Sequence, residues 1–554
     1  MRVPRSIVLA AVTAVTVPLA GCGGGAPADR GRPSGGAAPG AGAARPAPSA
    51  ATPAPGAWIA GHVAEMTLEE KVGQLFVPTF ASAADARAMI KRYRVGGLIY
   101  FPANFAGGPA ATARQSNALQ QASELPLLLS VDEEQGLVSR APFLTRFPGN
   151  MALGATRDPQ DAQAAARITG TELRAVGINQ DYAPVADVNV NPANPVIGVR
   201  SFGSDPALVS QLLTAAIGGY QSAGVAATAK HFPGHGDTAT DSHTGLPVIP
   251  HTRAEWERVD APPFQAAVRA RVDAIMSAHI VVPGLDSSGD PATLSKTVLT
   301  GLLRQRLGHQ GVIVTDSLQM QGARRKYGDG AVAVRAVNAG ADQLLMPPRL
   351  ATSYGAVLRA ARDGTIPRAR LDDAVTRILR LKEARGLFRG TTADPARADA
   401  VVGAAAHRAT ARQIAERAVT LVRNDSGLLP LRNRTVQVIG PRGDALMDAL
   451  RRNGVRLAAS PATADVVVLT TLNAGAATAA RIRSPGPKPV VVAALGSPYD
   501  LDRSTGAAAT LATYSSGSAA VMALGKVLAG TVKPAGRLPV KAGGRPFGHG
   551  LTYQ

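Results

Sequence analysis

Short apolar runs alternate with longer amphipathic segments along the chain from residue 67 onward. The runs are near-continuous in apolar residues, as the buried strands of a parallel sheet are. The stretches between them, such as residues 162–176, 206–223 and 296–307, are typical of helices. Eight such units predict an α/β fold with a (β/α)8 TIM-type barrel. The expected strands cover residues 74–78, 97–101, 127–131, 178–182, 226–231, 274–278, 312–316 and 343–346.

The pattern changes after the eighth unit. Residues 366–388 have apolar positions at helical spacing, which predicts a helix that closes the barrel. Farther on, strands alternate with helices again, which predicts a smaller α/β sandwich domain. Its expected strands are residues 436–439, 466–469 and 490–493, and its expected helices are 444–453 and 518–528. The predicted limits are 58–390 for the barrel, 391–433 for a linker and helix, and 434–554 for the C-terminal domain.

The N-terminus has the composition of an export signal. Two arginines precede an apolar run over residues 7–19, which is shorter than a membrane span. The run ends in Leu-Ala-Gly-Cys, which resembles the bacterial lipobox and makes Cys22 the expected lipidation site. We therefore expect a signal peptide over residues 1–22 and a flexible Ala/Gly/Pro tether over residues 23–57. The alternative is an ordinary signal with an accidental cysteine.

Composition restricts the class of partner. The net charge of +20 comes from scattered basic residues, and aromatic residues make up only 4% of the chain, so few side chains could stack on bases. We therefore expect no nucleic-acid binding and an anionic cell envelope as the neighbour. The single cysteine excludes an internal disulfide framework. The expected location is the extracytoplasmic face of the cell membrane, with part of the protein secreted, and the expected state is a monomer.

Residues 230–243 carry the strongest chemical signal. They read Lys-His-Phe-Pro-Gly-His-Gly-Asp-Thr-Ala-Thr-Asp-Ser-His and follow an apolar run directly. Three histidines, two aspartates and a lysine in a loop with few apolar anchors favour a binding or catalytic role. The His and Asp positions match no defined metal-ligand spacing, so we expect no metal and no cofactor.

Other polar residues also follow predicted strands. Asp132, Lys230 with His231, and Asp316 come at or after strand ends, which meet at one mouth of a barrel. One such residue alone is often only a helix cap. Asp316 follows a Val-Ile-Val-Thr strand and is the candidate nucleophile, because a strand would hold it rigidly. His243 is the candidate proton donor, because Asp241 can orient and stabilise its imidazole.

Four segments together resemble glycoside hydrolase family 3. They are the run Thr-Leu-Glu-Glu-Lys-Val-Gly-Gln-Leu-Phe from Thr67, residues 189–203, residues 230–243 and residues 312–320. The likeness is to the β-N-acetylglucosaminidase branch, especially its two-domain lipoprotein form in Gram-positive bacteria, and extends from about residue 57 to the C-terminus. The resemblance implies that Asp316 is the nucleophile and that His243, paired with Asp241, is the acid/base. It also implies five sugar ligands, namely Asp132, Arg140, Arg200, Lys230 and His231.

Two features qualify the resemblance. Where the family reads Asp-Gln-Glu-Gly-Gly-Arg-Val, this chain reads Asp-Glu-Glu-Gln-Gly-Leu-Val from Asp132, which changes the wall beside the sugar or its aglycone. A salt bridge at the barrel rim remains the alternative for Arg140. In addition, the β-glucosidase branch usually takes its acid from a Glu of the second domain, yet Glu416 is the only glutamate after residue 400. The Asp241–His243 pair therefore favours an N-acetylhexosaminidase.

The sequence thus predicts a retaining exo-β-N-acetylglucosaminidase that acts on peptidoglycan-derived saccharides. Three alternatives stay open at this point: a β-glucosidase or other β-glycosidase of the family, a lipid-anchored inactive glycan-binding protein, and catalysis assisted by the substrate's acetamido group. Phosphate could also replace water as the acceptor, because a histidine does not repel an anion as a carboxylate does.

Overall fold

The computed structural model describes residues 56–242, 245–324, 326–474, 482 and 488–553. Cys22 with its signal peptide and most of the predicted tether lie outside these residues, and so does His243. The helix α1 (Ala57–Glu65) begins at the last residue assigned to the tether. Among the described helices, none combines the length and the apolar composition that a membrane span requires.

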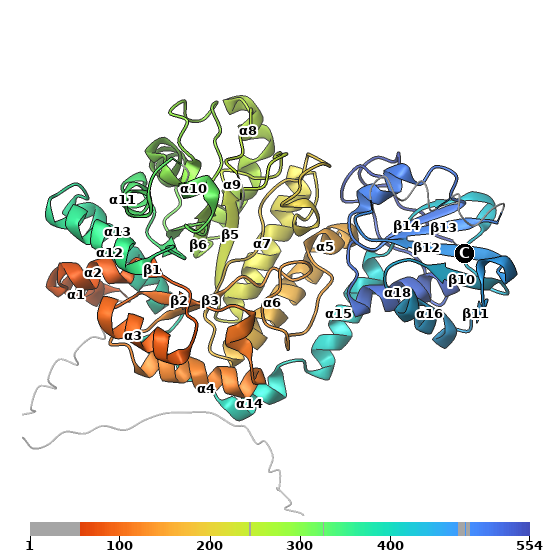
Figure 1. Cartoon of the computed structure of the whole chain (residues 1–554), viewed down its shortest axis with the longest axis horizontal. Helices are drawn as coiled ribbons and strands as arrows, with labels where there is room; N and C mark the ends of the chain where they lie inside the picture. The colour runs from red at the N-terminus through yellow and green to blue at the C-terminus, as the bar shows by residue number, and fades with distance from the viewer. Residues whose placement is uncertain (1–55, 243–244, 325, 475–481, 483–487, 554) are drawn as a thin grey trace, which may run out of the picture. The chain divides into compact units, whose positions relative to one another are not determined.

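Eight parallel strands form the N-terminal barrel, as the hydrophobic pattern predicts (Figure 1). The strands β2 to β7 pair in chain order in one sheet, and β1 pairs with β8. Single parallel bridges, Thr79 to Ile99 and Val314 to Gln343, join these two sheets at both edges and complete the ring. The strands are β1 (Phe76–Val77), β2 (Gly97–Ile99), β3 (Leu128–Val131), β4 (Gln180–Asp181), β5 (Ala226–Phe232), β6 (Ala274–Ser277), β7 (Val312–Thr315) and β8 (Leu344–Leu345).

The first predicted strand was placed too early. Gln74 ends the helix α2 (Leu68–Gln74), and β1 starts two residues later. A capping box begins this helix, because the Thr67 hydroxyl accepts the Glu70 N–H while the Glu70 carboxylate accepts the Thr67 N–H. The apolar run therefore spans a helix end and a strand, which periodicity does not separate.

Helices cover the outside of the barrel (Figure 1), and buried side chains fill its inside. Val77, Ile99, Met276, Val314 and Leu345 belong to one buried cluster inside the ring. Short buried strands thus pack on both faces, which explains their continuous apolar runs. The outer helices are α3 (Ala83–Tyr93), α4 (Gly108–Gln121), α6 (Pro159–Ala175), α7 (Pro206–Ser222), α9 (Ala261–Arg269), the π-helical segment Thr297–Arg306, α11 (Asp329–Ala339), α12 (Leu350–Arg362) and the predicted closing helix α13 (Arg368–Ala384).

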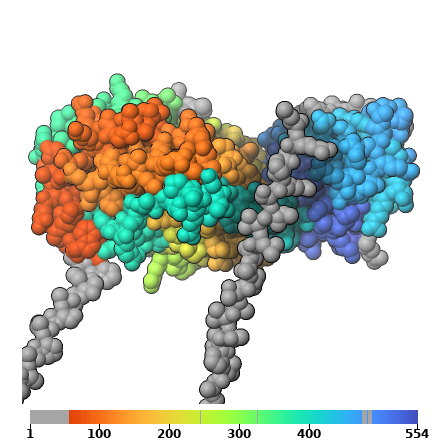
Figure 2. Space-filling view, turned by 90° about the horizontal axis from the view of Figure 1, so that it is seen from below, coloured from red at the N-terminus to blue at the C-terminus, as the bar shows by residue number. Residues whose placement is uncertain are grey.

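The segment after α13 packs back on the barrel. The helix α14 (Pro395–Val401), drawn in teal, lies against α4, drawn in orange, in Figure 2. The Asp399 carboxylate accepts the Ala110 N–H at 3.1 Å, and the Asn117 amide donates to the Ala393 carbonyl at 2.8 Å. These bonds fix the start of the connection to the second sheet.

The second sheet has six strands in the order β11-β10-β12-β13-β14-β9. The predicted strands are present as β10 (Thr435–Ile439), β12 (Val466–Thr471) and β13 (Val490–Ala494). The strand β9 (Thr420–Asn424) was not predicted, and it pairs antiparallel with β14 (Ala509–Ala512), so the sheet is mixed. The remaining elements are β11 (Arg456–Leu457) and the helices α15 (Ala405–Ala418), α16 (Gly443–Arg452) and α18 (Ser518–Ala529).

Candidate active site

A cavity of about 590 Å³ opens at the carboxyl ends of the barrel strands. Its lining residues follow six different strands, from Phe101 after β2 to Met346 after β8. Convergence of strand ends at one mouth is where barrel enzymes carry their chemistry. Seven of the predicted site residues line this cavity: Asp132, Arg140, Arg200, Lys230, His231, Asp241 and Asp316.

Lys230 is the centre of a buried ion cluster. Its ammonium lies 2.7 Å from Asp132 Oδ1 and 2.7 Å from Glu134 Oε1, although its side chain is only 2% exposed. Arg200 donates to the same Glu134 carboxylate from Nε and Nη2, both at 2.8 Å. The cluster therefore joins a residue of β5 to residues that follow β3 and β4 in one rigid unit.

The charges in this cluster stabilise each other. Burial alone would raise the pKa of Glu134, but Arg200 and Lys230 outweigh it and hold that pKa well below its usual range. Burial likewise opposes the charge of Lys230, while Asp132 and Glu134 outweigh it and raise the lysine pKa. The Glu134 carboxylate and the Lys230 ammonium at the floor of the cavity therefore both stay charged at neutral pH.

His231 is oriented by Asp187, a buried residue of the segment after β4. The Asp187 carboxylate lies 2.7 Å from His231 Nδ1 and also accepts the backbone N–H groups of His231 and His235. This pairing leaves Nε2 of His231 directed toward Arg200, at 3.4 Å from its Nη2. An imidazole held in one orientation by a carboxylate suits a sugar ligand.

Asp316 follows the last residue of β7 and lines the same cavity. Burial would raise its pKa, but His231, His279, Lys230 and the N–H of Ser317 outweigh that effect and lower it. The Ser317 N–H donates to Asp316 Oδ1 at 2.7 Å. Asp316 is therefore an ionised carboxylate held at a strand end, as a glycosidase nucleophile must be.

Arg140 presents a donor to the cavity. Its guanidinium lies over the ring of Phe101, 5.6 Å from the ring centre. Its Nε is buried and has no hydrogen-bond partner among the described residues. The alternative role for Arg140 was a salt bridge at the barrel rim. Among the described residues, Arg140 forms no ion pair.

The loop after β5 is fixed by two further histidines. His235, whose pKa is lowered to about 4 by burial, contacts the hydroxyls of Thr238 at 3.0 Å and Ser242 at 2.9 Å. His251 contacts Asp237 at 3.1 Å. Asp241 lines the cavity between these anchors, and His243 is outside the described residues.

Three residues in or behind the site were not predicted as functional. Glu134 lines the cavity, Asp187 orients His231, and His279 lies beside Asp316, with its Nε2 2.9 Å from the Ser317 carbonyl. Glu134 gave a weak signal, because it stands two positions after Asp132 in an acidic run at a strand end. Asp187 and His279 gave none, because each acts on a partner distant in sequence.

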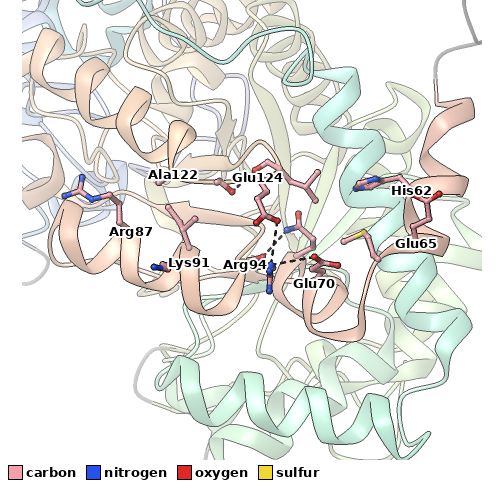
Figure 3. Close-up of a pocket in the computed structure, with 13 residues that line it drawn as sticks. His62, Glu65, Glu70, Arg87, Lys91, Arg94, Ala122 and Glu124 are labelled. Atoms are coloured by element: carbon pink, nitrogen blue, oxygen red, sulfur yellow. Dashed lines mark hydrogen bonds and ion pairs between the residues drawn. The ribbon is translucent and has the colours of Figure 1, made fainter.

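A second cavity, of about 660 Å³, lies among α1, α2, α3 and the segment after α4 (Figure 3). Arg94 lies between Glu70, at 3.7 Å, and Glu124, at 3.8 Å. Its lining segments precede β1, β2 and β3, so this cavity lies at the amino ends of the strands. It is larger, but it contains none of the predicted site residues.

The fold and the site together define the class of protein. A parallel barrel with a strand-end carboxylate and clustered cations and anions at its mouth is typical of a glycosidase. Residues 67–381 match the N-terminal domain of glycosyl hydrolase family 3, and residues 463–545 match its C-terminal domain. The chain belongs to this family.

Relatives and solved structures agree with this assignment. β-Hexosaminidase A of Pseudoalteromonas piscicida is 38% identical over 384 residues, 64% of each chain, so the match spans just under two thirds of that relative. A β-N-acetylglucosaminidase/β-glucosidase of Cellulomonas fimi is 35% identical over 68% of each chain. The structure of a family 3 β-N-acetylglucosaminidase from Paenibacillus sp. is similar with a TM-score of 0.80 and 38% identity, over 86% of this chain and 99% of that one.

Proposed function

We propose that the chain is a retaining exo-β-N-acetylglucosaminidase that releases terminal N-acetylglucosamine from peptidoglycan fragments outside the membrane. One observation carries the proposal. Asp316, a carboxylate of lowered pKa, shares a cavity with the ion cluster of Asp132, Glu134, Arg200 and Lys230. The donors and acceptors of this cluster can hold sugar hydroxyls in one orientation against the nucleophile. The likeness to the Paenibacillus enzyme supports N-acetylglucosamine as the sugar.

The proposed mechanism has two steps. Asp316 attacks the anomeric carbon, while His243 protonates the oxygen of the leaving group. His243 then takes a proton from water, which attacks the anomeric carbon and releases Asp316. Asp241 stabilises the imidazolium that donates the proton in the first step and that forms again in the second. The lowered pKa keeps Asp316 ionised for the first attack.

The position of Glu416 supports this choice of acid. Its carboxylate accepts a hydrogen bond from Lys526 Nζ at 2.5 Å, which ties α15 to α18. Glu416 does not line the cavity, and it is the only glutamate after residue 400. The second domain therefore offers no glutamate for proton transfer.

The first experiment measures hydrolysis of a chromogenic N-acetylglucosaminide by the wild type, Asp316→Ala and His243→Ala proteins. We expect Asp316→Ala to lose at least about 10³-fold in kcat. Full activity in this variant would refute the mechanism, and an inactive wild type would favour a glycan-binding protein. A 2-fluoro sugar should label Asp316, and failure to label would favour acetamido-assisted hydrolysis. Sugar 1-phosphate formed in phosphate buffer would identify phosphate as the acceptor.

A β-glucosidase is the second candidate, because the Cellulomonas fimi relative carries both activities in its name. The same assay with the matching glucoside separates the two. We expect kcat/KM for the N-acetylglucosaminide to exceed that for the glucoside by at least about 10-fold, since a site that hydrogen-bonds a substituent rejects an analogue lacking it. An equal or higher value for the glucoside would select the second candidate.

A further inference from the structure

Arg200 belongs to a loop whose two ends meet. The loop covers residues 189–203, between β4 and α7, and the Asn189 N–H donates to the Gly203 carbonyl at 2.9 Å. Arg200 stands close to the second end of the loop, and its guanidinium donates to Glu134 in the ion cluster of the cavity. Contacts that fix the base of this loop, where its ends meet, therefore also fix Arg200.

The second domain contacts the base of the loop at both ends. At the first end, the Tyr499 hydroxyl accepts a hydrogen bond from the Asn189 side-chain amide at 3.1 Å. At the second end, the Ser204 N–H donates to the Pro539 carbonyl at 3.0 Å. Gly203 allows this close approach, because a Cβ there would lie only 2.5 Å from the Pro539 carbonyl oxygen. Two separate segments of the second domain thus hold the base of the loop.

The loop also packs on the second domain beside Arg200. Val199 lies against a buried apolar cluster that the helix α5 (Asn150–Thr156) shares with Leu538 of the second domain. From the same helix, the Asn150 amide donates to the Arg200 carbonyl at 2.8 Å. The backbone at Arg200 is therefore held on one side by α5 and the second domain, while its side chain reaches the ion cluster.

Tyr499 is itself fixed within the second domain. It belongs to a short 3₁₀ helix, Pro498–Arg503, and the Ser497 hydroxyl accepts its backbone N–H at 3.3 Å. The Ser497 N–H in turn donates to the side-chain oxygen of Asn473 at 2.9 Å. The hydroxyl of Tyr499 is thus presented to the barrel from a well-anchored position.

Asn189 depends on this one hydroxyl. Its side chain is 1% exposed, and its amide oxygen has no hydrogen-bond partner among the described residues. Without the Tyr499 hydroxyl, the whole side-chain amide would be buried without a partner inside the described part of the chain. A buried amide in that state is costly, so the first end of the loop would shift to find a new partner.

We propose that Tyr499 is a positioning residue of the active site, through which the second domain holds the 189–203 loop so that Arg200 is in place to bind the sugar. The inference rests on the proposed function, in which Arg200 is a sugar ligand. The second domain offers no glutamate for proton transfer, and in this role it acts on substrate binding instead. A small shift of the loop would weaken the contact between the guanidinium and the sugar.

The test is Tyr499→Phe, which removes one hydroxyl and keeps the ring. The measurements are kcat and KM for the chromogenic N-acetylglucosaminide and the inhibition constant of the product, N-acetylglucosamine. We expect KM and the inhibition constant each to rise by about 5-fold or more, and kcat to change by less than about 2-fold. A bond with a merely structural role would lower the amount of folded enzyme, and with it kcat, but would leave both other constants unchanged.

Tyr553→Phe is the matched control. Tyr553 is also half-buried, and its hydroxyl donates to the Val527 carbonyl inside the second domain. This variant loses the same chemical group and the same kind of bond without a contact to the loop. It should leave KM and the inhibition constant at the wild-type values.

A double variant tests whether Tyr499 acts through Asn189. In the Asn189→Leu background the partner of the hydroxyl is absent, so Tyr499→Phe should cause no further rise in KM. An equal rise in both backgrounds, or a Tyr499→Phe protein with unchanged KM and inhibition constant, would overturn this inference alone. A wild type that neither cleaves the N-acetylglucosaminide nor binds N-acetylglucosamine would overturn the proposed function, and this inference with it.

Discussion

Two regions of the active site hold their residues in different ways. The inner wall consists of Asp132, Glu134, Arg200, Lys230 and His231, which lie on or after strands. Ion pairs of 2.7–2.8 Å join the first four, and His231 lies 3.4 Å from Arg200. The outer loop consists of residues 233–242, which follow β5 and are held by backbone and side-chain hydrogen bonds. His235 contacts Ser242 within the loop, and Asp237 contacts His251 outside it.

The difference matches the two tasks of a glycosidase. Sugar ligands must be within a fraction of an ångström of one geometry, and strands with a buried ion network supply that rigidity. Isolated ions are costly to bury, so the wall depends on complete pairing. A proton donor must approach the leaving oxygen in one step and a water molecule in the next, and a loop allows such adjustment.

Removal of the Lys230 ammonium should disrupt the ion cluster of the inner wall. In Lys230→Met, the carboxylates of Asp132 and Glu134 lose their shared partner inside the protein. We expect a loss of about 3–5 kcal/mol in the free energy of unfolding, because one half of a buried ion pair remains. We also expect kcat/KM for the chromogenic substrate to fall by about 10²-fold or more. Denaturant unfolding and steady-state kinetics measure the two effects.

Lys71→Met is the matched control for this variant. Lys71 is 1% exposed and pairs with Asp372 at 2.6 Å, far in sequence from the site and outside the cavity lining. It should destabilise the protein with kcat/KM unchanged. The double variant Lys230→Met/Asp132→Asn should regain stability but not activity, since both residues are predicted sugar ligands. Recovery of activity in the double variant would contradict the role of the inner wall.

Glu133, a further carboxyl group beside the inner wall, lowers the stability of the folded protein at alkaline pH. Glu133 is fully buried, and burial raises its pKa to about 7 despite hydrogen bonds from Ser139 and the N–H groups of Arg140 and Ala141. The folded chain therefore binds this proton more tightly than the unfolded chain does, whose pKa is near 4.5. The contribution to stability is complete below pH 4.5 and is lost as the pH rises to about 7.

Glu133→Gln should remove this loss. We expect a gain of about 2–3 kcal/mol in the free energy of unfolding at pH 8 and little change at pH 4.5. The amide can still accept both backbone N–H groups, and the Ser139 hydroxyl can accept from its NH₂. Urea unfolding followed by tryptophan fluorescence reports on the barrel, because Trp58 and Trp256 both belong to it. An equal effect at both pH values would rule out titration of Glu133 as the cause.

Some residues at strand ends were more predictable from sequence than the carboxylates that pair with their neighbours. The strands β1 to β8 are short apolar runs, so the residues at their ends were expected at one mouth, and Asp132, Lys230 and Asp316 do line one cavity. Glu134 and Asp187 were missed, because they pair with Arg200 and His231, which lie on or after other strands. Long-range pairing leaves no periodic signal. The antiparallel strand β9 was missed for the same reason.

The loss of one contact in the outer loop should lower kcat/KM less than the loss of one contact in the inner wall. His251 bridges Asp260, at 2.7 Å, and Asp237, at 3.1 Å. The hydrogen bond that its imidazole donates to Asp260 and the charge of both carboxylates raise its pKa to about 9, although burial opposes them. His251 is thus charged at neutral pH. The stability that it contributes is complete below pH 6.5, its ordinary value, and is lost as the pH rises through about 9.

In His251→Gln we expect kcat/KM to fall by about 5- to 10-fold, because Asp237 loses its tie and the loop that carries Asp241 samples more positions. The affinity for a competitive sugar inhibitor should stay unchanged, since the inner wall is intact. His407→Gln is the matched control, because His407 contacts the buried Glu172 at 2.7 Å outside the cavity. It should cost stability without lowering kcat/KM. If His251→Gln instead weakens the inhibitor as much as it lowers kcat/KM, the loop and the wall are one unit, and the division between them fails.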